Sequence, residues 1–244
     1  MKVSVLTACH NCEPYLSDCI GSILRQQYSD WEMIIVDDAS SDNSRKVIQK
    51  YAKRDDRIKL IVPPERLKCG GAYNLAMKNA TGDICCVLDS DDALPNDKCM
   101  EKVVNAYVDH PEVDYIWTRY YICSPKLKKE QMGSSSLPPT SFLTAGIEYT
   151  EYRHAFSHWR TCRTCLRDKG LIFNPSLKAA VDKWMGYTLE ELGVGGFIKE
   201  PLYLYRRRLG GLSFKGRRIW KNMMKVFKEK RDQNNIIPYK TKLL

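Results

Sequence analysis

Ile84-Cys85-Cys86-Val87-Leu88-Asp89-Ser90-Asp91-Asp92 is the stretch of sequence that decides the fold of this chain. Its apolar half is typical of a buried strand, and its acidic half needs water or a cation beside it. Because side chains alternate along a strand, Asp89 and Asp91 should point the same way and share one hard divalent ion. Acidic triplets also occur in solvated loops and helix caps, so the motif by itself is weak evidence for a metal site.

A second stretch of the same design comes earlier in the chain. The apolar run at 33–36 leads directly into Asp37 and Asp38. In a parallel sheet, the carboxyl ends of neighbouring strands lie at one edge, which is where ligands bind. The two acidic strand ends therefore predict one site above one sheet.

Strands and helices are expected to alternate along the first hundred residues. This spacing predicts right-handed crossovers and an α/β fold with a doubly wound, parallel sheet. Gly70-Gly71 is expected to open the third helix, and Thr7 lies at the carboxyl end of the first strand. The predicted strands are 3–8, 31–36, 58–62 and the run that begins at 84, and the predicted helices are 14–27, 44–54 and 72–80.

The chain has 244 residues, which suits one large catalytic domain with a C-terminal extension. Its apolar runs are too short for a signal peptide or a membrane span, so we expect a cytoplasmic protein. The ten cysteines fall largely at core positions and should be reduced. A zinc site built from Cys9, Cys12, Cys162 and Cys165 is disfavoured, because about 150 residues separate the two pairs.

Positive charge is concentrated late in the sequence. The net charge is +10 and the pI is about 9.0, which favours anionic partners. Residues 214–231 combine lysines and arginines with apolar residues at helical spacing, which predicts a basic amphipathic helix. Such a helix can pack on the core with a solvated cationic back, contact an anionic membrane surface, or bind nucleic acid.

The loop after the first strand excludes two common nucleotide sites. Residues 7–13 contain no glycine, whereas a dinucleotide fold or a P-loop needs a glycine-rich turn there. The glycine-rich basic loop with which many nucleotidyltransferases hold a triphosphate is missing as well.

Several motifs in order resemble the inverting family 2 glycosyltransferases of the GT-A fold. They cover residues 1–110 strongly and 155–213 more loosely. The resemblance implies a single GT-A, Rossmann-like domain at 1–213, with a mostly parallel twisted sheet flanked by helices. Its nucleotide-sugar-binding half is 1–110, its acceptor-binding half is 111–213, and 214–244 is a basic C-terminal extension. The motifs are Val3-Ser4-Val5-Leu6-Thr7, Asn11, Glu13, Tyr15-Leu16, the segments 27–32 and 35–44, Cys69-Gly70-Gly71-Ala72-Tyr73-Asn74 and Asp89-Ser90-Asp91-Asp92.

This resemblance assigns roles to residues of the first half. Thr7 and Glu13 match positions that line the nucleoside pocket, and Asp38 matches the residue that hydrogen-bonds the base, often uracil. Asp89 matches a ribose or sugar contact, and Asp91 matches the ligand of the Mn²⁺ or Mg²⁺ that bridges the diphosphate. The remaining donor-binding candidates lie in the same motifs: Ala8, where the family often has Pro; Lys68, which supplies a positive charge because Tyr73 replaces a common Arg; Gly71; and Ser90.

In the second half, Val181-Asp182-Lys183-Trp184 resembles the segment that carries the catalytic base, so Asp182 is the candidate base. The alternative is a surface carboxylate paired with Lys178 or Lys183, and Glu190 and Glu191 are fallback bases. An inverting transfer is one in-line displacement: a carboxylate takes the acceptor proton while a metal stabilises the departing nucleoside diphosphate.

Arg208 stands where many members have a His, and its guanidinium could hold phosphate oxygens or form a solvated rim. The polar stretch 126–152 is expected to be a lid or acceptor loop, and 154–160 suits stacking on an acceptor. His154 and His158 have no acidic third ligand, so no zinc site is expected there.

The resemblance thus implies a hexosyltransferase of polysaccharide biosynthesis that moves a sugar from a nucleoside-diphosphate sugar to a glycan or lipid-linked acceptor. A UDP-sugar is the expected donor. Peripheral contact with the inner membrane face is compatible with the basic tail. Two alternatives stay open: an enzyme that glycosylates modified bases of DNA, and an inactive paralogue that only binds nucleotide sugars.

Overall fold

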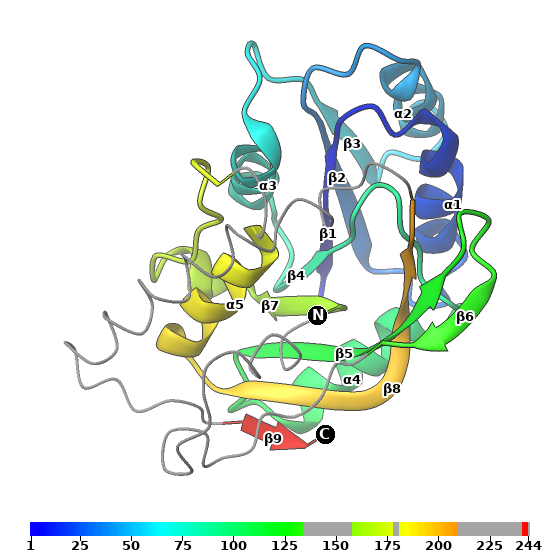
Figure 1. The fold of residues 1–244 in the computed structure, drawn as a ribbon. Helices are drawn as coiled ribbons and strands as arrows, with labels where there is room; N and C mark the ends of the chain where they lie inside the picture. Colours follow the sequence, from blue (N-terminus) through cyan, green and yellow to red (C-terminus); the bar gives the residue numbers. More distant parts are fainter. Residues whose placement is uncertain (134–157, 178–180, 209–240, 244) are drawn as a thin grey trace.

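The computed structural model describes residues 1–133, 158–177, 181–208 and 241–243 of the chain (Figure 1). Its first half alternates strands with helices, as predicted. The elements of this half are β1 (Val3–Cys9), α1 (Glu13–Leu24), β2 (Trp31–Asp37), α2 (Ser44–Ala52), β3 (Ile58–Ile61), α3 (Lys68–Lys78) and β4 (Ile84–Val87).

The second half adds strands that extend the sheet from β4. Its elements are α4 (Cys99–Asp109), β5 (Tyr115–Cys123), β6 (Lys129–Met132), β7 (Arg160–Arg163), the 3-10 helix η2 (Thr164–Arg167), α5 (Val181–Leu192), β8 (Gly195–Arg206) and β9 (Thr241–Leu243).

In the described residues the strands form one mixed sheet in the order β3-β2-β1-β4-β7-β5-β8-β9, with β6 paired to β5. The pairs among β3, β2, β1 and β4 are parallel, as are β5–β8 and β8–β9. Only β6 and β7 run antiparallel to their neighbours in this part of the chain. A mostly parallel α/β sheet is therefore confirmed, and β7 is the strand that joins its two parallel blocks.

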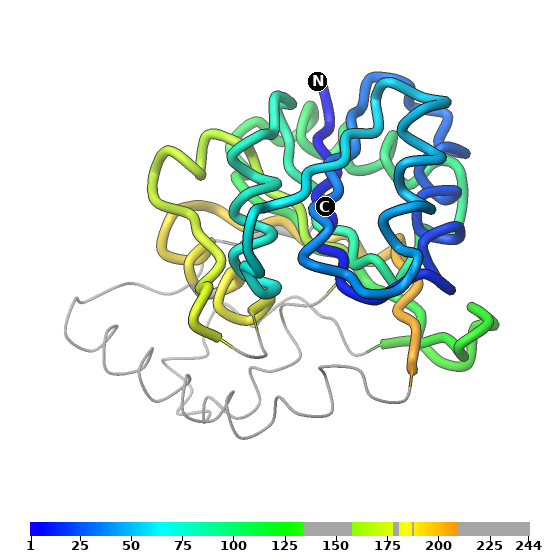
Figure 2. The backbone as a smooth tube through the Cα atoms, turned by 90° about the horizontal axis from the view of Figure 1, so that it is seen from above, coloured from blue at the N-terminus to red at the C-terminus, as the bar shows by residue number. Residues whose placement is uncertain are grey.

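Helices cover both faces of the sheet (Figure 2). On one face α1, α2 and α4 bury residues such as Ile20, Ile48 and Val103 against the strands. On the other face α3 and α5 bury residues such as Ala76 and Met185. The apolar strands have helices on both sides, which explains why β2 reads as a continuous buried run and does not alternate.

The boundary predicted for the third helix is wrong, because α3 begins at Lys68 and contains both glycines. The glycines are needed there for packing. A Cβ at Gly70 would lie 2.5 Å from the carbonyl oxygen of Asn174, and one at Gly71 would lie 2.9 Å from Cβ of Leu67. The segment at 174–175 thus packs directly on the backbone of α3, and this contact links α3 to the chain just before α5.

All ten cysteines are free thiols and eight of them are buried, which confirms their assignment to the core. Cys162 lies in β7, whose neighbour β4 separates it from β1 and its Cys9, so the four cysteines considered for zinc are not brought together.

Within the described ranges, no helix combines the length and the apolar character that crossing a membrane requires. The basic segment 214–231, most of the predicted lid and His154 lie outside the described residues.

Candidate active site

The candidate site lies where β1, β2 and β4 end, with β1 between the two acidic strand ends. The strand alternation that was expected to align Asp89 with Asp91 is wrong, because β4 ends at Val87. The acidic residues that follow form a turn, in which the amide of Asp92 donates to the carbonyl of Asp89 at 3.0 Å. Each carboxylate of this turn consequently has its own set of partners.

Asp89 is at the centre of the site and receives donors from three elements. Its carboxylate accepts the Tyr73 hydroxyl from α3 and, at 3.1 Å, Nη2 of Arg160 from β7. The Tyr203 hydroxyl of β8 lies 3.4 Å away, and Nε2 of His158 lies 3.7 Å away. Burial alone would raise the pKa of Asp89, but Arg160 and His158 outweigh it and hold that pKa below its usual range.

Asp182 lies in the first turn of α5 and is joined to Asp89 through one side chain. Nη1 of Arg160 is 3.1 Å from the Asp182 carboxylate, while Arg160 itself is only 5% exposed. Asp182 retains 35% of its side-chain exposure. Burial raises the pKa of Asp182, yet Arg160 and Lys183 together lower it, so the carboxylate is ionised at neutral pH. Arg160, which is distant in sequence, is thus an ion-pair partner of Asp182, the charge of Lys183 also acts on this carboxylate, and Lys178 lies outside the described residues.

Asp91 faces a different cation. Nε of Arg208 lies 2.5 Å from its carboxylate, and the Arg208 guanidinium also lies over the Tyr15 ring, 5.4 Å from the centroid. Burial raises the pKa of Asp91, Arg208 opposes this effect, and the charge of Asp89 adds to it. Arg208 therefore lies in the site and does not form a solvated rim.

Asp92 has a structural role. It is 1% exposed, and its two oxygens accept the Tyr203 hydroxyl at 2.8 Å and the Arg206 amide at 2.7 Å. Arg206 is buried too, and it pairs with Asp18 of α1 at 2.7 Å. These contacts attach β8 to the acidic turn and to α1.

Three predicted donor-binding residues have partners inside the protein. Thr7 is fully buried and donates to the Leu88 carbonyl at 2.8 Å, which links β1 to the acidic turn. The Asp38 carboxylate accepts the Leu67 amide at 2.6 Å, next to the start of α3. The Glu13 carboxylate accepts the amide of Asn43, the residue before α2, at 3.1 Å.

The other predicted residues lie around the same end of the sheet. Ala8 is in β1 and half-buried, and Lys68 begins α3 with a positive φ of 61°. Gly71 is in the first turns of α3. The Ser90 hydroxyl is buried and donates to the Cys12 sulfur at 3.1 Å. The hydrogen bond with Cys9 lowers the pKa of the Cys12 thiol to about 7, although burial of the thiol opposes this effect.

His158, Arg160, Tyr73 and Tyr203 are site residues whose roles the sequence did not reveal. The His158 ring stacks on Tyr203 with centroids 4.8 Å apart and meets Tyr120 edge-on at 5.1 Å. Burial and Arg160 lower the pKa of His158, although Asp89 opposes them. The aromatic and basic composition of 154–160 was the available signal, but it suggested an acceptor surface and not contacts with Asp89.

Among the described residues, one group of side chains could hold a metal ion. Ligand atoms of Asp89, Asp92 and His158 all lie within 4.8 Å of one another. Two carboxylates and an imidazole suit ions such as Mn²⁺. Asp91, the residue predicted from the sequence, is next to this group but contributes no atom to it.

The family model of glycosyl transferase family 2 matches residues 4–168. The chain belongs to this family. Relatives of the chain include the UDP-Glc:alpha-D-GlcNAc-diphosphoundecaprenol beta-1,3-glucosyltransferase WfgD of Escherichia coli, which is 40% identical over 90 residues, or 37% of this chain and 35% of the relative. The poly(ribitol-phosphate) beta-N-acetylglucosaminyltransferase TarS of Staphylococcus aureus is 26% identical over 189 residues, or 75% of this chain and 31% of the relative.

Two solved structures share the fold. TarS residues 1–349 in complex with UDP-GlcNAc superpose with a TM-score of 0.70 at 21% identity, covering 87% of this chain and 60% of that one. The mannosyltransferase PcManGT of Pyrobaculum calidifontis, solved with GDP-Man and Mn²⁺, gives a TM-score of 0.64 at 20% identity, covering 89% of this chain and 60% of that one. The matched regions of the curated relatives quoted above span about a third of their length.

Proposed function

We propose that this chain transfers a sugar from a UDP-sugar to a hydroxyl group of a glycan or lipid-linked acceptor, with inversion at the anomeric carbon. One observation carries the proposal. Asp182 offers a carboxylate with 35% exposure, and a single guanidinium joins that carboxylate to Asp89 at the acidic end of β4. A general base is thereby held next to the carboxylates assigned to the donor.

The chemistry asks for a base that is ionised before the reaction begins. Asp182 meets this requirement, because Arg160 and Lys183 keep its pKa low. It would accept the proton of the acceptor hydroxyl as that oxygen attacks the anomeric carbon and the nucleoside diphosphate departs. Glu190 and Glu191 are eight and nine residues further along α5, about 12 Å away along the helix axis, and are less suitable.

The acidic turn fits a divalent cation. Asp89 and Asp91 retain 29% and 21% of their side-chain exposure, and their like charges lie close enough to raise the pKa of Asp91. We propose Asp91 as the ligand of Mn²⁺ or Mg²⁺, with Asp89 beside it, because both side chains keep exposed area whereas Asp92 is 1% exposed. When bound, the ion would offset the negative charge that develops on the departing diphosphate. The Mn²⁺ in the PcManGT complex supports this choice.

For the donor, we propose contacts from the residues at the ends of β1 and β2 and from Arg208. Asp38 is assigned to the base, with Glu13, Ala8, Lys68 and Gly71 around the nucleoside. Ser90 of the acidic turn belongs to the same proposed donor-binding set, and the Arg208 guanidinium could hold phosphate oxygens bidentately. The UDP-Glc in the name of WfgD and the UDP-GlcNAc bound to TarS support a uridine nucleotide.

For the acceptor, we propose a polymer or lipid-linked glycan that carries phosphate. The names of WfgD and TarS specify a diphosphoundecaprenol-linked sugar and poly(ribitol-phosphate). A net charge of +10 would favour acceptors of this kind electrostatically.

The test is a screen of UDP- and GDP-sugars for hydrolysis and transfer with Mn²⁺ present, using Asp182→Asn as the matched variant. Asp182→Asn should bind UDP like the wild type and lose transfer by about 100-fold or more, because it cannot take the acceptor proton. UDP binding with no turnover of any sugar by the wild type would identify an inactive paralogue. Transfer to hydroxymethylated DNA, but to no glycan, would identify the DNA-modifying alternative.

A further inference from the structure

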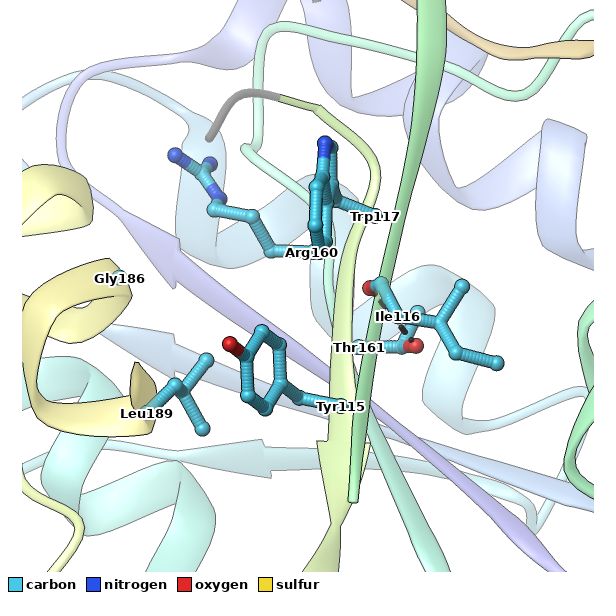
Figure 3. Close-up of a pocket in the computed structure, with 7 residues that line it drawn as sticks. All are labelled: Tyr115, Ile116, Trp117, Arg160, Thr161, Gly186 and Leu189. Carbon is cyan, nitrogen blue, oxygen red and sulfur yellow. Dashed lines mark hydrogen bonds between the residues drawn. The ribbon is translucent and has the colours of Figure 1, made fainter. Parts of the chain in front are cut away.

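Arg160 connects the two halves of the candidate site. It begins β7, and its side chain extends from that strand on the side of the sheet where α5 lies (Figure 3). Nη2 is 3.1 Å from the carboxylate of Asp89, and Nη1 is 3.1 Å from that of Asp182. One guanidinium therefore spans the distance between the donor side of the site and the base.

The surroundings of Arg160 give it few other partners. Its side chain lines a narrow cavity with apolar groups of β5 and α5, among them Trp117 and Leu189 (Figure 3). Its Nε is buried and finds no hydrogen-bond partner in the described part of the chain. The charge of this buried arginine is thus balanced by Asp89 and Asp182, which it holds from two different nitrogens.

Arg163, three residues further along β7, provides a structural arginine in the same strand for comparison. Its guanidinium donates to backbone carbonyls of Val113, Tyr107 and Pro111, at 2.8 to 3.2 Å. Within the described residues, the Arg160 guanidinium instead joins two carboxylates, those of Asp89 and Asp182. Arg163 therefore stabilises the backbone around β7, whereas Arg160 connects two carboxylates of the candidate site.

We propose that Arg160 is a positioning residue that sets the separation and orientation of the base Asp182 relative to Asp89. The inference rests on the proposed function and adds a residue to it. Arg160 is too buried to serve as a phosphate-binding group, since both of its terminal nitrogens are engaged and 5% of it is exposed. Lysine cannot replace it, because a single ammonium does not span two carboxylates as a planar guanidinium does.

The position of the Asp182 carboxylate depends on Arg160 more than the position of the Asp89 carboxylate does. Asp89 also accepts a hydrogen bond from Tyr73 and has Nε2 of His158 3.7 Å away, and both contacts would remain after Arg160 is removed. Loss of Arg160 should therefore misplace the base while leaving the donor side in place. In kinetic terms, kcat should fall and KM for the donor should change little.

The experiment compares Arg160→Ala, Arg160→Lys and the matched control Arg163→Ala in the full chain. A misplaced base should lower kcat of both Arg160 variants by about 100-fold, with the donor KM within about threefold of the wild type. Guanidinium at about 20 mM, far below the molar concentrations that unfold proteins, should restore kcat of Arg160→Ala at least about tenfold. Ammonium at the same ionic strength should not. Arg163→Ala should lower Tm, keep its kcat and show no response to guanidinium.

Three results would overturn the proposal: wild-type kcat in either Arg160 variant, a loss in folded Arg160→Ala that guanidinium does not reverse, or equal rescue by ammonium. If Arg160→Ala does not fold, the test rests on Arg160→Lys, which should show a lower kcat with a nearly unchanged KM for the donor. Wild-type transfer is measured first. Its absence would count against the proposed function, whereas an active wild type with an unaffected Arg160 variant would count only against this inference.

Discussion

The guanidinium of Arg208 lies against the carboxylate of Asp91, with Nε 2.5 Å from Oδ2. This is the carboxylate that we propose as the metal ligand, so arginine and metal ion would compete for it. Arg208 is the last described residue before 209–240, and it reaches the site because β8, which ends at Arg206, is attached to the acidic turn through Asp92.

Replacing Arg208 and replacing Asp91 should change the response of the enzyme to metal in opposite directions. Arg208→Gln frees the carboxylate and should lower the Mn²⁺ concentration for half-maximal activity by about tenfold, since one unit of opposing charge is lost. Asp91→Asn should abolish most of the metal-dependent activity, because the main anionic ligand becomes neutral. Manganese titrations of activity measure both, with the exposed Asp168→Asn as control. Wild-type turnover that persists in saturating chelator would exclude the metal assignment.

Asp38→Ala should weaken binding of the donor and also loosen the start of α3. The Asp38 carboxylate accepts the Leu67 amide, and losing such a buried bond costs about 1 to 3 kcal/mol. We expect the dissociation constant for UDP to rise about tenfold, which corresponds to one hydrogen bond to the base. Calorimetric titration with UDP and a thermal melt report the two effects separately. A lower Tm with unchanged UDP affinity would leave Asp38 with the structural role alone.

Glu32 should make the fold sensitive to acid. Its buried carboxylate accepts hydrogen bonds from Ser4, Lys59 and Thr81 at 2.7 to 2.8 Å. Burial alone would raise the pKa of Glu32, but these donors outweigh it and lower the pKa to about 2. Because the folded pKa lies below the unfolded one, the stabilisation is present above about pH 4.5 and is lost as the pH falls towards 2.

Glu32→Gln should consequently reduce the free energy of unfolding at pH 7 by about 3 kcal/mol and flatten its decline between pH 4.5 and 2. Urea unfolding at several pH values measures this. The control is Glu200→Gln, which removes an exposed ion pair with Lys102 and should cost less than about 1 kcal/mol. An equal pH slope in Glu32→Gln and the wild type would contradict the assignment.

The basic segment 214–231, which lies outside the described residues, should recruit the enzyme to an anionic surface. Each cation near such a surface contributes on the order of 1 kcal/mol, so the cluster can hold the protein there. Replacing the lysines and arginines of 214–231 by glutamine keeps β9, which pairs with β8, and should abolish co-sedimentation with anionic liposomes while leaving the domain folded. Aggregation of this variant would make the segment part of the core. Binding to duplex DNA but not to liposomes at matched salt would favour the nucleic-acid alternative.

Local pattern was sufficient for much of the fold. The order of strands and helices up to β4, the parallel pairing of that block and the acidic strand ends all follow from the periodicity of apolar residues and from the handedness of crossovers. The family resemblance placed Asp182 near the site, and the structure brings it to Asp89 through Arg160. Helix ends were less well predicted, since Gly70 is required by packing against the segment at 174–175, which is far from α3 in the sequence.

By itself, the sequence determined a mostly parallel α/β sheet with carboxylates at its edge, because those features depend on residues close together along the chain. Only the tertiary structure decided what those carboxylates contact. Arg160 lies 71 positions after Asp89, and Tyr203 lies 114 positions after it. They meet there because β7 inserts antiparallel between β4 and β5 and because β8 is attached to the acidic turn. Pairing between such distant strands depends on the packing of the whole sheet, so no local pattern could reveal these contacts.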